Sequence, residues 1–97
     1  MDLINLIITD IASGFNINKW AMFTSSRKRN VTDARFVCCY FLHRKLKRSS
    51  NETGRFFGIS HATVLHACKN VELWVDDCRV NPMATEIIKQ INDKYKL

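Results

Sequence analysis

Residues 49–70 have the sequence SSNETGRFFGISHATVLHACKN, which predicts two helices joined by a tight turn. Ser49 followed by Glu52 fits a capping box, in which the serine hydroxyl and the glutamate carboxylate each bind a backbone amide left free at a helix start. Gly58 suits the left-handed conformation that ends a helix, and Ser60 is a good cap for the next one. The pattern is typical of a helix-turn-helix over about residues 49–78.

The second helix of this pair is predicted to have one apolar side and one polar side. Apolar residues recur at spacings of three and four, and they are Val64, Ala67, Cys68, Val71, Trp74, Val75 and Cys78. The opposite side carries small, polar or basic residues, namely His61, Ala62, Thr63, His66, Lys69 and Asn70. The first residues of the second helix of a helix-turn-helix lie in the major groove of DNA. We therefore expect base contacts from Ser60, His61, Ala62 and Thr63.

Positive charge is concentrated in the middle of the chain. The chain has 97 residues and a net charge of +6, but the segment from Lys19 to Arg55 alone has ten basic and two acidic residues. A surface with such an excess is expected to bind a polyanion. Nucleic acid is the first candidate, and an anionic membrane or a solvated face without a ligand stays open from charge alone.

Two segments account for most of these basic residues. Residues 24–30 have no apolar periodicity and include Arg27, which a loop can place in the minor groove of DNA or against a phosphate. A long helix is predicted from Thr32 or Asp33 to about Lys47, with Ala34, Val37, Cys38, Phe41 and Leu42 facing inward. The expected phosphate contacts are Lys28, Arg29, Arg35, His43, Lys45, Lys47, Arg48, His66 and Lys69.

Three further helices are predicted around this pair. Residues 2–15 have an apolar face, and Asn18 is a plausible cap for a short helix that turns Trp20 and Phe23 inward. Asn81 followed by Pro82 predicts the start of the last helix, whose apolar face consists of Met83, Ile87, Ile88, Ile91 and Tyr95. The expected fold is an all-α bundle of five to six helices in a single domain over residues 1–97.

Several other classes of protein are excluded by the residue pattern. All four cysteines, Cys38, Cys39, Cys68 and Cys78, fall on predicted helices without metal-ligand spacing, so we expect reduced core thiols and no metal. Cys68 and His66 are two apart on a helix and point to different faces, which argues against a catalytic pair. No signal peptide or membrane span is evident, and no heptad repeat. We expect a monomer with no small-molecule substrate and no contact with a membrane.

A family resemblance begins at the second helix of the pair, where residues 61–68 have the sequence HATVLHAC. This segment closely resembles the signature of the C-terminal DNA-binding domain of the bacterial chromosomal replication initiator DnaA, in which HTTVLHA is usual. Residues 26–29 (SRKR), 33–35 (DAR) and 4–15 also match that domain. The resemblance implies binding to double-stranded DNA at replication-origin boxes, with Arg27 in the minor groove and Arg35 in contact with the DNA.

The sequence departs from the family pattern where bases would be read. The family turn is usually one residue longer, with Gly-Gly-Arg-Asp before the histidine. Ser60 replaces an aspartate that accepts hydrogen bonds from a base, Ala62 replaces the first threonine, and Asn51 stands where proline is common. Each lost base contact costs about 1–3 kcal/mol of discrimination. Two altered positions are therefore enough to abolish the preference for the usual A/T-rich box, whereas we expect affinity for the DNA backbone to survive because the basic residues remain.

The biological setting is left open by the sequence. The glycines Gly14, Gly54 and Gly58 are too scattered for a phosphate-binding loop, so we expect neither a nucleotide cofactor nor enzymatic activity. One setting is a stand-alone binder from a phage or mobile element that regulates replication or transcription. Another is the origin-recognition domain of a larger initiator. The alternative function is a protein-interaction module for a replication-initiation partner. The expected location is cytoplasmic, at the nucleoid of a bacterium or in a phage-infected cell.

Overall fold

The computed structural model describes residues 2–97, which form five α-helices, one short 3-10 helix and one π-helical turn without a strand. In chain order these are α1 (Leu3–Gly14), η1 (Lys19–Phe23), α2 (Arg29–Tyr40), η2 (Phe41–Lys45), α3 (Ser50–Phe57), α4 (His61–Asp76) and α5 (Pro82–Tyr95). The all-α prediction is confirmed, and α3 and α4 form the predicted helix-turn-helix.

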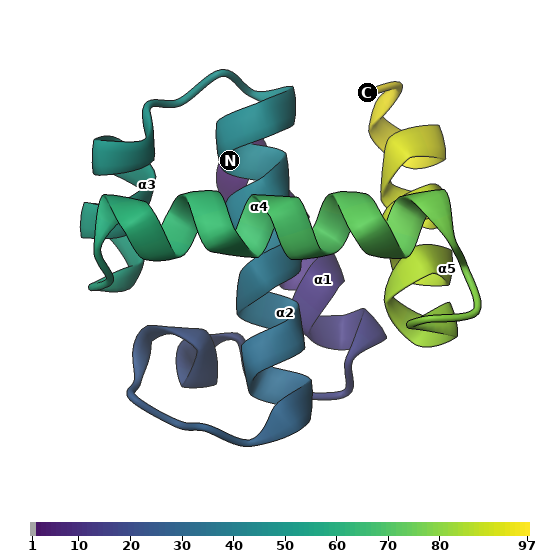
Figure 1. Ribbon diagram of the computed structural model, residues 1–97, viewed down its shortest axis with the longest axis horizontal. Helices are drawn as coiled ribbons and strands as arrows, with labels where there is room; N and C mark the ends of the chain where they lie inside the picture. The colour runs from purple at the N-terminus through teal and green to yellow at the C-terminus, as the bar shows by residue number, and fades with distance from the viewer. Residues whose placement is uncertain (1) are drawn as a thin grey trace.

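Helix α2 lies at the centre of the bundle. Figure 1 shows α4 crossing in front of α2, with α1 behind it, α3 beside the start of α4 and α5 beside its end. The inward side of α2 includes Ala34, Val37 and Cys38, none of which has measurable exposure. Val64, Ala67 and Val71 of α4 are equally buried. The main core therefore holds α4 against α2, which fixes the direction in which the outer face of α4 points.

Side chains next to the helix starts explain where five of these helices begin. Each accepts a hydrogen bond from a backbone amide of the first turn, and they are Asp2, Asn18, Ser49, Ser60 and Asn81. Of the predicted capping box, the serine half is present, with the Glu52 amide 3.0 Å from the Ser49 hydroxyl. Gly58 has φ 72° and ψ 32°, the predicted left-handed end of α3. These local signals explain why the turn was predictable.

Helix α2 starts earlier than the sequence predicted, at Arg29 instead of Thr32 or Asp33. Val31 is buried, so the apolar spacing that includes Ala34 extends back by one turn. Arg29 and Asp33 form an ion pair of 3.7 Å at i,i+4, which also favours the helix. The basic loop is therefore shorter than predicted and consists of residues 24–28.

Trp20 and Phe23 face solvent, which corrects the prediction that they face inward. Their exposed fractions are 66% and 37%. In a 3-10 helix, residues three apart lie on the same side, so Trp20 and Phe23 share one side and Lys19 and Met22 the other. Met22 is fully buried and determines which side faces the core. Trp20 and Phe23 instead form an exposed aromatic surface with Phe56 of α3.

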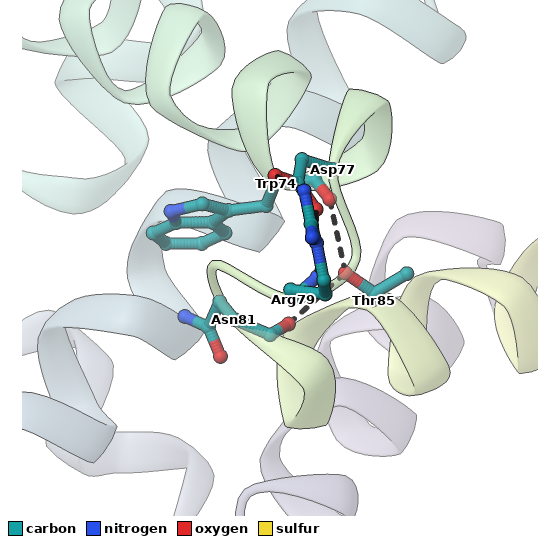
Figure 2. Close-up of polar contacts among 5 residues, drawn as sticks. All are labelled: Trp74, Asp77, Arg79, Asn81 and Thr85. Atoms are coloured by element: carbon teal, nitrogen blue, oxygen red, sulfur yellow. Dashed lines mark hydrogen bonds and ion pairs between the residues drawn. The ribbon is translucent and has the colours of Figure 1, made fainter.

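Three more residues expected in the core are exposed, and for Cys78 the reason is that α4 ends at Asp76, before it. Val75 is 43% exposed next to the buried Trp74, Cys78 lies in the connection after α4, and Met83 is 49% exposed in the first turn of α5. Figure 2 shows that connection, in which the Thr85 hydroxyl lies 3.0 Å from the Asn81 carbonyl and 3.2 Å from that of Trp74. The polar contacts thus turn the chain from α4 into α5.

Helices α1 and α5 are joined by a polar cluster at the end of the chain. The Asp10 carboxylate accepts hydrogen bonds from the Tyr95 hydroxyl and from Lys94, the latter at 2.9 Å. Partial burial acts to raise the pKa of Asp10, but these hydrogen bonds and the charge of Lys94 outweigh it and hold that pKa below its usual value. This cluster keeps α5 against the core on the side away from α3.

We predict that Gly54→Ala destabilises the domain, because Gly54 is where α3 approaches the turn most closely. A Cβ atom there would lie 2.6 Å from the carbonyl oxygen of Ile59. Overpacking of this kind costs about 1–3 kcal/mol, and each kcal/mol lowers the melting temperature of so small a domain by about 4–8 °C. Thermal unfolding measures the effect. Asn51→Ala, at an exposed site on the same helix, is the control, and equal melting temperatures for both variants would contradict the prediction.

Candidate nucleic-acid interface

The first three turns of α4 present a continuous outer face to solvent. Its exposed residues alternate with the buried stripe and are His61, Ala62, Leu65, His66 and Lys69. Leu65 was not among the predicted site residues, although it lies four residues after His61 and three after Ala62 and therefore shares their face. Its exposed fraction of 36% leaves an apolar surface that can contact a thymine methyl group.

Ser60 and Thr63 are hydrogen-bonded to each other at the start of this face. The Ser60 hydroxyl accepts from the Thr63 amide at 3.1 Å and lies 2.8 Å from the Thr63 hydroxyl. The first bond caps α4, and the second uses one of the two hydroxyl protons. One hydroxyl proton of the pair therefore remains free to donate to a base. The structure thus brings Ser60, His61, Ala62 and Thr63 together, with the two hydroxyl groups coupled.

His66 is held in place by residues on two helices. Its ring meets Phe36 of α2 edge-on, with 6.0 Å between ring centroids. The Asn70 side-chain nitrogen lies 3.1 Å from Nε2 of His66 and donates to the His66 carbonyl at 3.0 Å. If Nε2 accepts from Asn70, Nδ1 carries the proton and is a donor for a phosphate oxygen. Lys69 on the next turn is exposed.

The basic loop extends from one end of α2, below the N-terminal half of α4 in Figure 1. Arg27 and Lys28 are exposed there, and Arg29 follows in the first turn of α2. Arg35 differs from these residues because its guanidinium donates to two carbonyls of the protein, those of Met22 at 2.9 Å and Thr24 at 2.8 Å. Arg35 is half-buried.

The other end of α2 contributes a second group of basic residues. The carbonyl of Arg48 can only accept, so Nδ1 of His43 donates to it across 2.8 Å and closes the turn after η2. Lys47 in this turn has φ 62°, and the Lys45 ammonium lies 5.9 Å from the ring centre of Tyr40. In Figure 1 this connection lies above the N-terminal half of α4, opposite the basic loop. Positive charge therefore flanks that half on two sides.

The C-terminal half of α4 has the opposite charge. Glu72, Asp76 and Asp77 lie there, and Glu72 is 3.5 Å from the guanidinium of Arg44. Hydrogen bonds from the Arg79 side chain and backbone hold the pKa of Asp77 below its usual value, so its carboxylate stays charged at neutral pH. Arg44 and Arg79 pair with two of these three acids, so a polyanion is repelled only weakly here and is attracted to the first half of α4.

The three buried cysteines lie in the core and are not part of the candidate interface. Burial raises the pKa of Cys39 to about 12 and that of Cys68 to about 11, so both thiols are protonated at neutral pH. Cys38 is buried as well, whereas Cys78 is exposed. Among residues 2–97 no group of three His, Cys, Asp or Glu side chains is placed to hold a metal ion. The same residues contain no helix long and apolar enough to span a bilayer.

A separate apolar hollow lies beside the aromatic surface. It has a volume of about 290 Å³ and includes Ile4, Trp20, Phe23 and Phe56 in its wall. Arg48, predicted to contact phosphate, lines an adjoining hollow with Leu42 and Phe56. These hollows are formed by α1, η1, α3 and η2 with the connection that follows it, not by the outer face of α4.

A family model described as the bacterial DnaA protein helix-turn-helix matches residues 4–71, the span from α1 into α4. The chain belongs to this family of DNA-binding domains. The match ends within α4, so the acidic end of α4 and the whole of α5 lie beyond it. The predicted resemblance to the DnaA domain, expected over about residues 3–78, is therefore confirmed for residues 4–71.

Individual DnaA proteins are similar to this chain over two thirds of its length or more. The chromosomal replication initiator protein DnaA of Bacteroides fragilis is 42% identical over 67 residues, which are 68% of this chain and 14% of that protein. The protein of the same name from Flavobacterium psychrophilum is 32% identical over 98 residues, covering 100% of this chain and 19% of its own length. The chain thus spans less than a fifth of these DnaA relatives.

We predict that the hydroxyl of Ser60 stabilises the domain through its cap on α4. Ser60→Ala removes the acceptor for the Thr63 amide and should cost about 0.5–2 kcal/mol of unfolding free energy. Ser60→Asp keeps an acceptor and adds negative charge at a helix N-terminus, so its stability should stay close to that of the unmodified domain. Denaturant unfolding compares the three proteins. Equal stability of the alanine and aspartate variants would contradict the capping role.

Proposed function

We propose that this chain is a sequence-specific double-stranded DNA-binding domain that recognises sites of the DnaA-box type. The observation that carries the proposal is the exposed first half of α4 with positive charge on two sides. A helix of this kind fits the major groove, and charges beside it meet the phosphates that border the groove. The acidic second half of α4 limits the contact to the N-terminal turns.

Base recognition is assigned to the start of α4. His61 and Ala62 are the outermost residues of its first turn, and Leu65 extends their surface by one turn. Ala62 and Leu65 offer methyl groups to thymine, whereas His61 and the free hydroxyl proton of the Ser60 and Thr63 pair offer hydrogen bonds. Arg27 is assigned to the minor groove, because narrow A/T-rich grooves attract arginine.

Phosphate binding is assigned to the groups that flank α4. These contacts fix the position of the domain on DNA and carry no sequence information themselves. The proposed residues are Lys28, Arg29, His43, Lys45, Lys47, Arg48, His66 and Lys69. For His43, Nδ1 already donates to the Arg48 carbonyl, so a contact with phosphate requires a second ring proton, on Nε2. Arg35 is not among them, because its guanidinium donates to two carbonyls of its own chain.

The setting that we propose is replication initiation or its regulation at the nucleoid. The curated relatives are named as chromosomal replication initiators, and this chain covers 14% of the one from Bacteroides fragilis. Origin recognition within a larger initiator and box binding by a regulator from a phage or mobile element both use the same face. We propose that one monomer of the domain occupies one site.

Fluorescence anisotropy tests the function with a labelled duplex that carries a DnaA box and with a scrambled duplex of equal length. With five to seven phosphates neutralised, the logarithmic salt slope should be about −5 to −6. The box should bind more tightly than the scrambled duplex. Equal, salt-sensitive binding would mean that the target is another sequence. No binding at low salt would contradict the proposal and favour a protein-interaction module, for which the exposed aromatic surface is the available site.

Two substitutions separate the assigned roles in this assay. His61→Ala should weaken binding to the box by about 1–3 kcal/mol more than binding to the scrambled duplex. Lys69→Ala should weaken both and reduce the steepness of the salt slope by about one. Lys89→Ala removes the same charge from an exposed position on α5 and is the matched control. Equal effects of Lys69→Ala and Lys89→Ala would remove Lys69 from the interface.

A further inference from the structure

The start of the basic loop is fixed by the guanidinium of Arg35. Nε donates to the carbonyl of Met22 at 2.9 Å, and Nη2 donates to that of Thr24 at 2.8 Å. These carbonyls lie on either side of Phe23, where η1 ends. A guanidinium holds its N–H groups in a rigid plane, so two bonds to two carbonyls fix both the position and the orientation of this backbone.

The rest of the loop is ordered by two hydroxyl groups. Thr24 donates from Oγ1 to the Ala21 carbonyl at 2.7 Å and accepts from the Ser26 amide at 3.2 Å. Ser26 in turn accepts from the Lys28 amide at 3.3 Å. Arg27 therefore lies between two residues whose backbone amides are held by side chains. A loop ordered in this way before binding loses less conformational entropy when it meets a ligand.

We infer that Arg35 is a positioning residue for DNA binding, which acts by holding the basic loop in the conformation that presents Arg27. The inference rests on the proposed function and specifies how its minor-groove contact is prepared. The sequence suggested a direct contact of Arg35 with DNA, whereas the half-buried guanidinium faces the carbonyls of its own chain. A lysine at this position can replace Arg35 in a direct contact with DNA, but not in holding the basic loop.

Arg35→Lys separates the roles because lysine keeps the positive charge but not the planar pair of donors. The first readout is backbone order of residues 25–28 in the free protein by ¹⁵N relaxation. Order parameters should fall from the rigid value of about 0.85 toward about 0.6. Affinity for the box duplex should fall about tenfold, since the loop must then be ordered on binding. Arg44→Lys, which can keep the ion pair with Glu72, is the control and should change neither quantity.

A double-mutant cycle with Arg27→Ala then tests whether Arg35 acts through the loop. Arg35→Lys should cost little affinity once Arg27 is absent, because the positioned side chain is missing. Unchanged order parameters, or equal losses in both backgrounds, would overturn the inference. A third result would also overturn the inference. If Arg35→Lys bound with full affinity and Arg35→Met had a salt slope less steep by about one, Arg35 would contact a phosphate directly.

Failure of the proposed function can be told apart from failure of the inference about Arg35. Failure of the unmodified domain to bind either duplex would count against DNA binding itself. The relaxation measurement uses no DNA, so it still decides whether Arg35 holds the loop.

Discussion

The packing of α4 across α2 is the constraint on which the interface depends. Val64, Ala67, Cys68 and Val71 have no measurable exposure, and burial of each valine contributes about 1.5–3 kcal/mol relative to leaving it in water. This contact sets the rotation of α4 about its axis, and that rotation decides that His61, Ala62 and Leu65 face outward. Because α2 crosses behind α4, its two ends emerge on opposite sides of α4 (Figure 1). The basic residues at those ends are thereby placed where they can flank a bound duplex.

The two halves of α4 differ in charge. The first half has exposed polar and basic residues, and its cap is a neutral serine. The second half has Glu72, Asp76 and Asp77 and joins a connection that the Thr85 hydroxyl holds to α4 (Figure 2). The family match ends at residue 71, where this change of charge begins. The family model therefore covers the first half of α4, whereas the similarity to the Flavobacterium psychrophilum protein extends over the whole chain.

Much of this architecture could be predicted from the sequence because its signals are local. Ser49, Gly58, Ser60 and the pair of Asn81 and Pro82 each determine a helix end through their own backbone neighbourhood, and all were placed correctly. The apolar spacing of α4 likewise identified its buried side from Val64 to Trp74. That spacing failed at Cys78 because periodicity does not say where a helix stops, and Val75 is exposed although it lies within α4.

The remaining features depend on contacts between distant residues. Burial of Met22 against α2 turns Trp20 and Phe23 outward, and no pattern within η1 shows which side will face the core. The role of Arg35 depends on carbonyls more than ten residues away in the chain. Its charge suggested a phosphate contact, but only the fold shows that its donors meet the backbone. Leu65 does not depend on such distant contacts, because its spacing from His61 is sufficient to place it on the outer face of α4.

The central claim is that the first half of α4 and the two ends of α2 form one continuous DNA-binding face. Chemical-shift mapping of the ¹⁵N-labelled domain during titration with a box duplex tests it most directly. We expect the largest changes in residues 25–29, 46–49 and 60–69, with α5 nearly unchanged. Changes centred on α5 or on the acidic end of α4, with residues 60–69 unaffected, would contradict it.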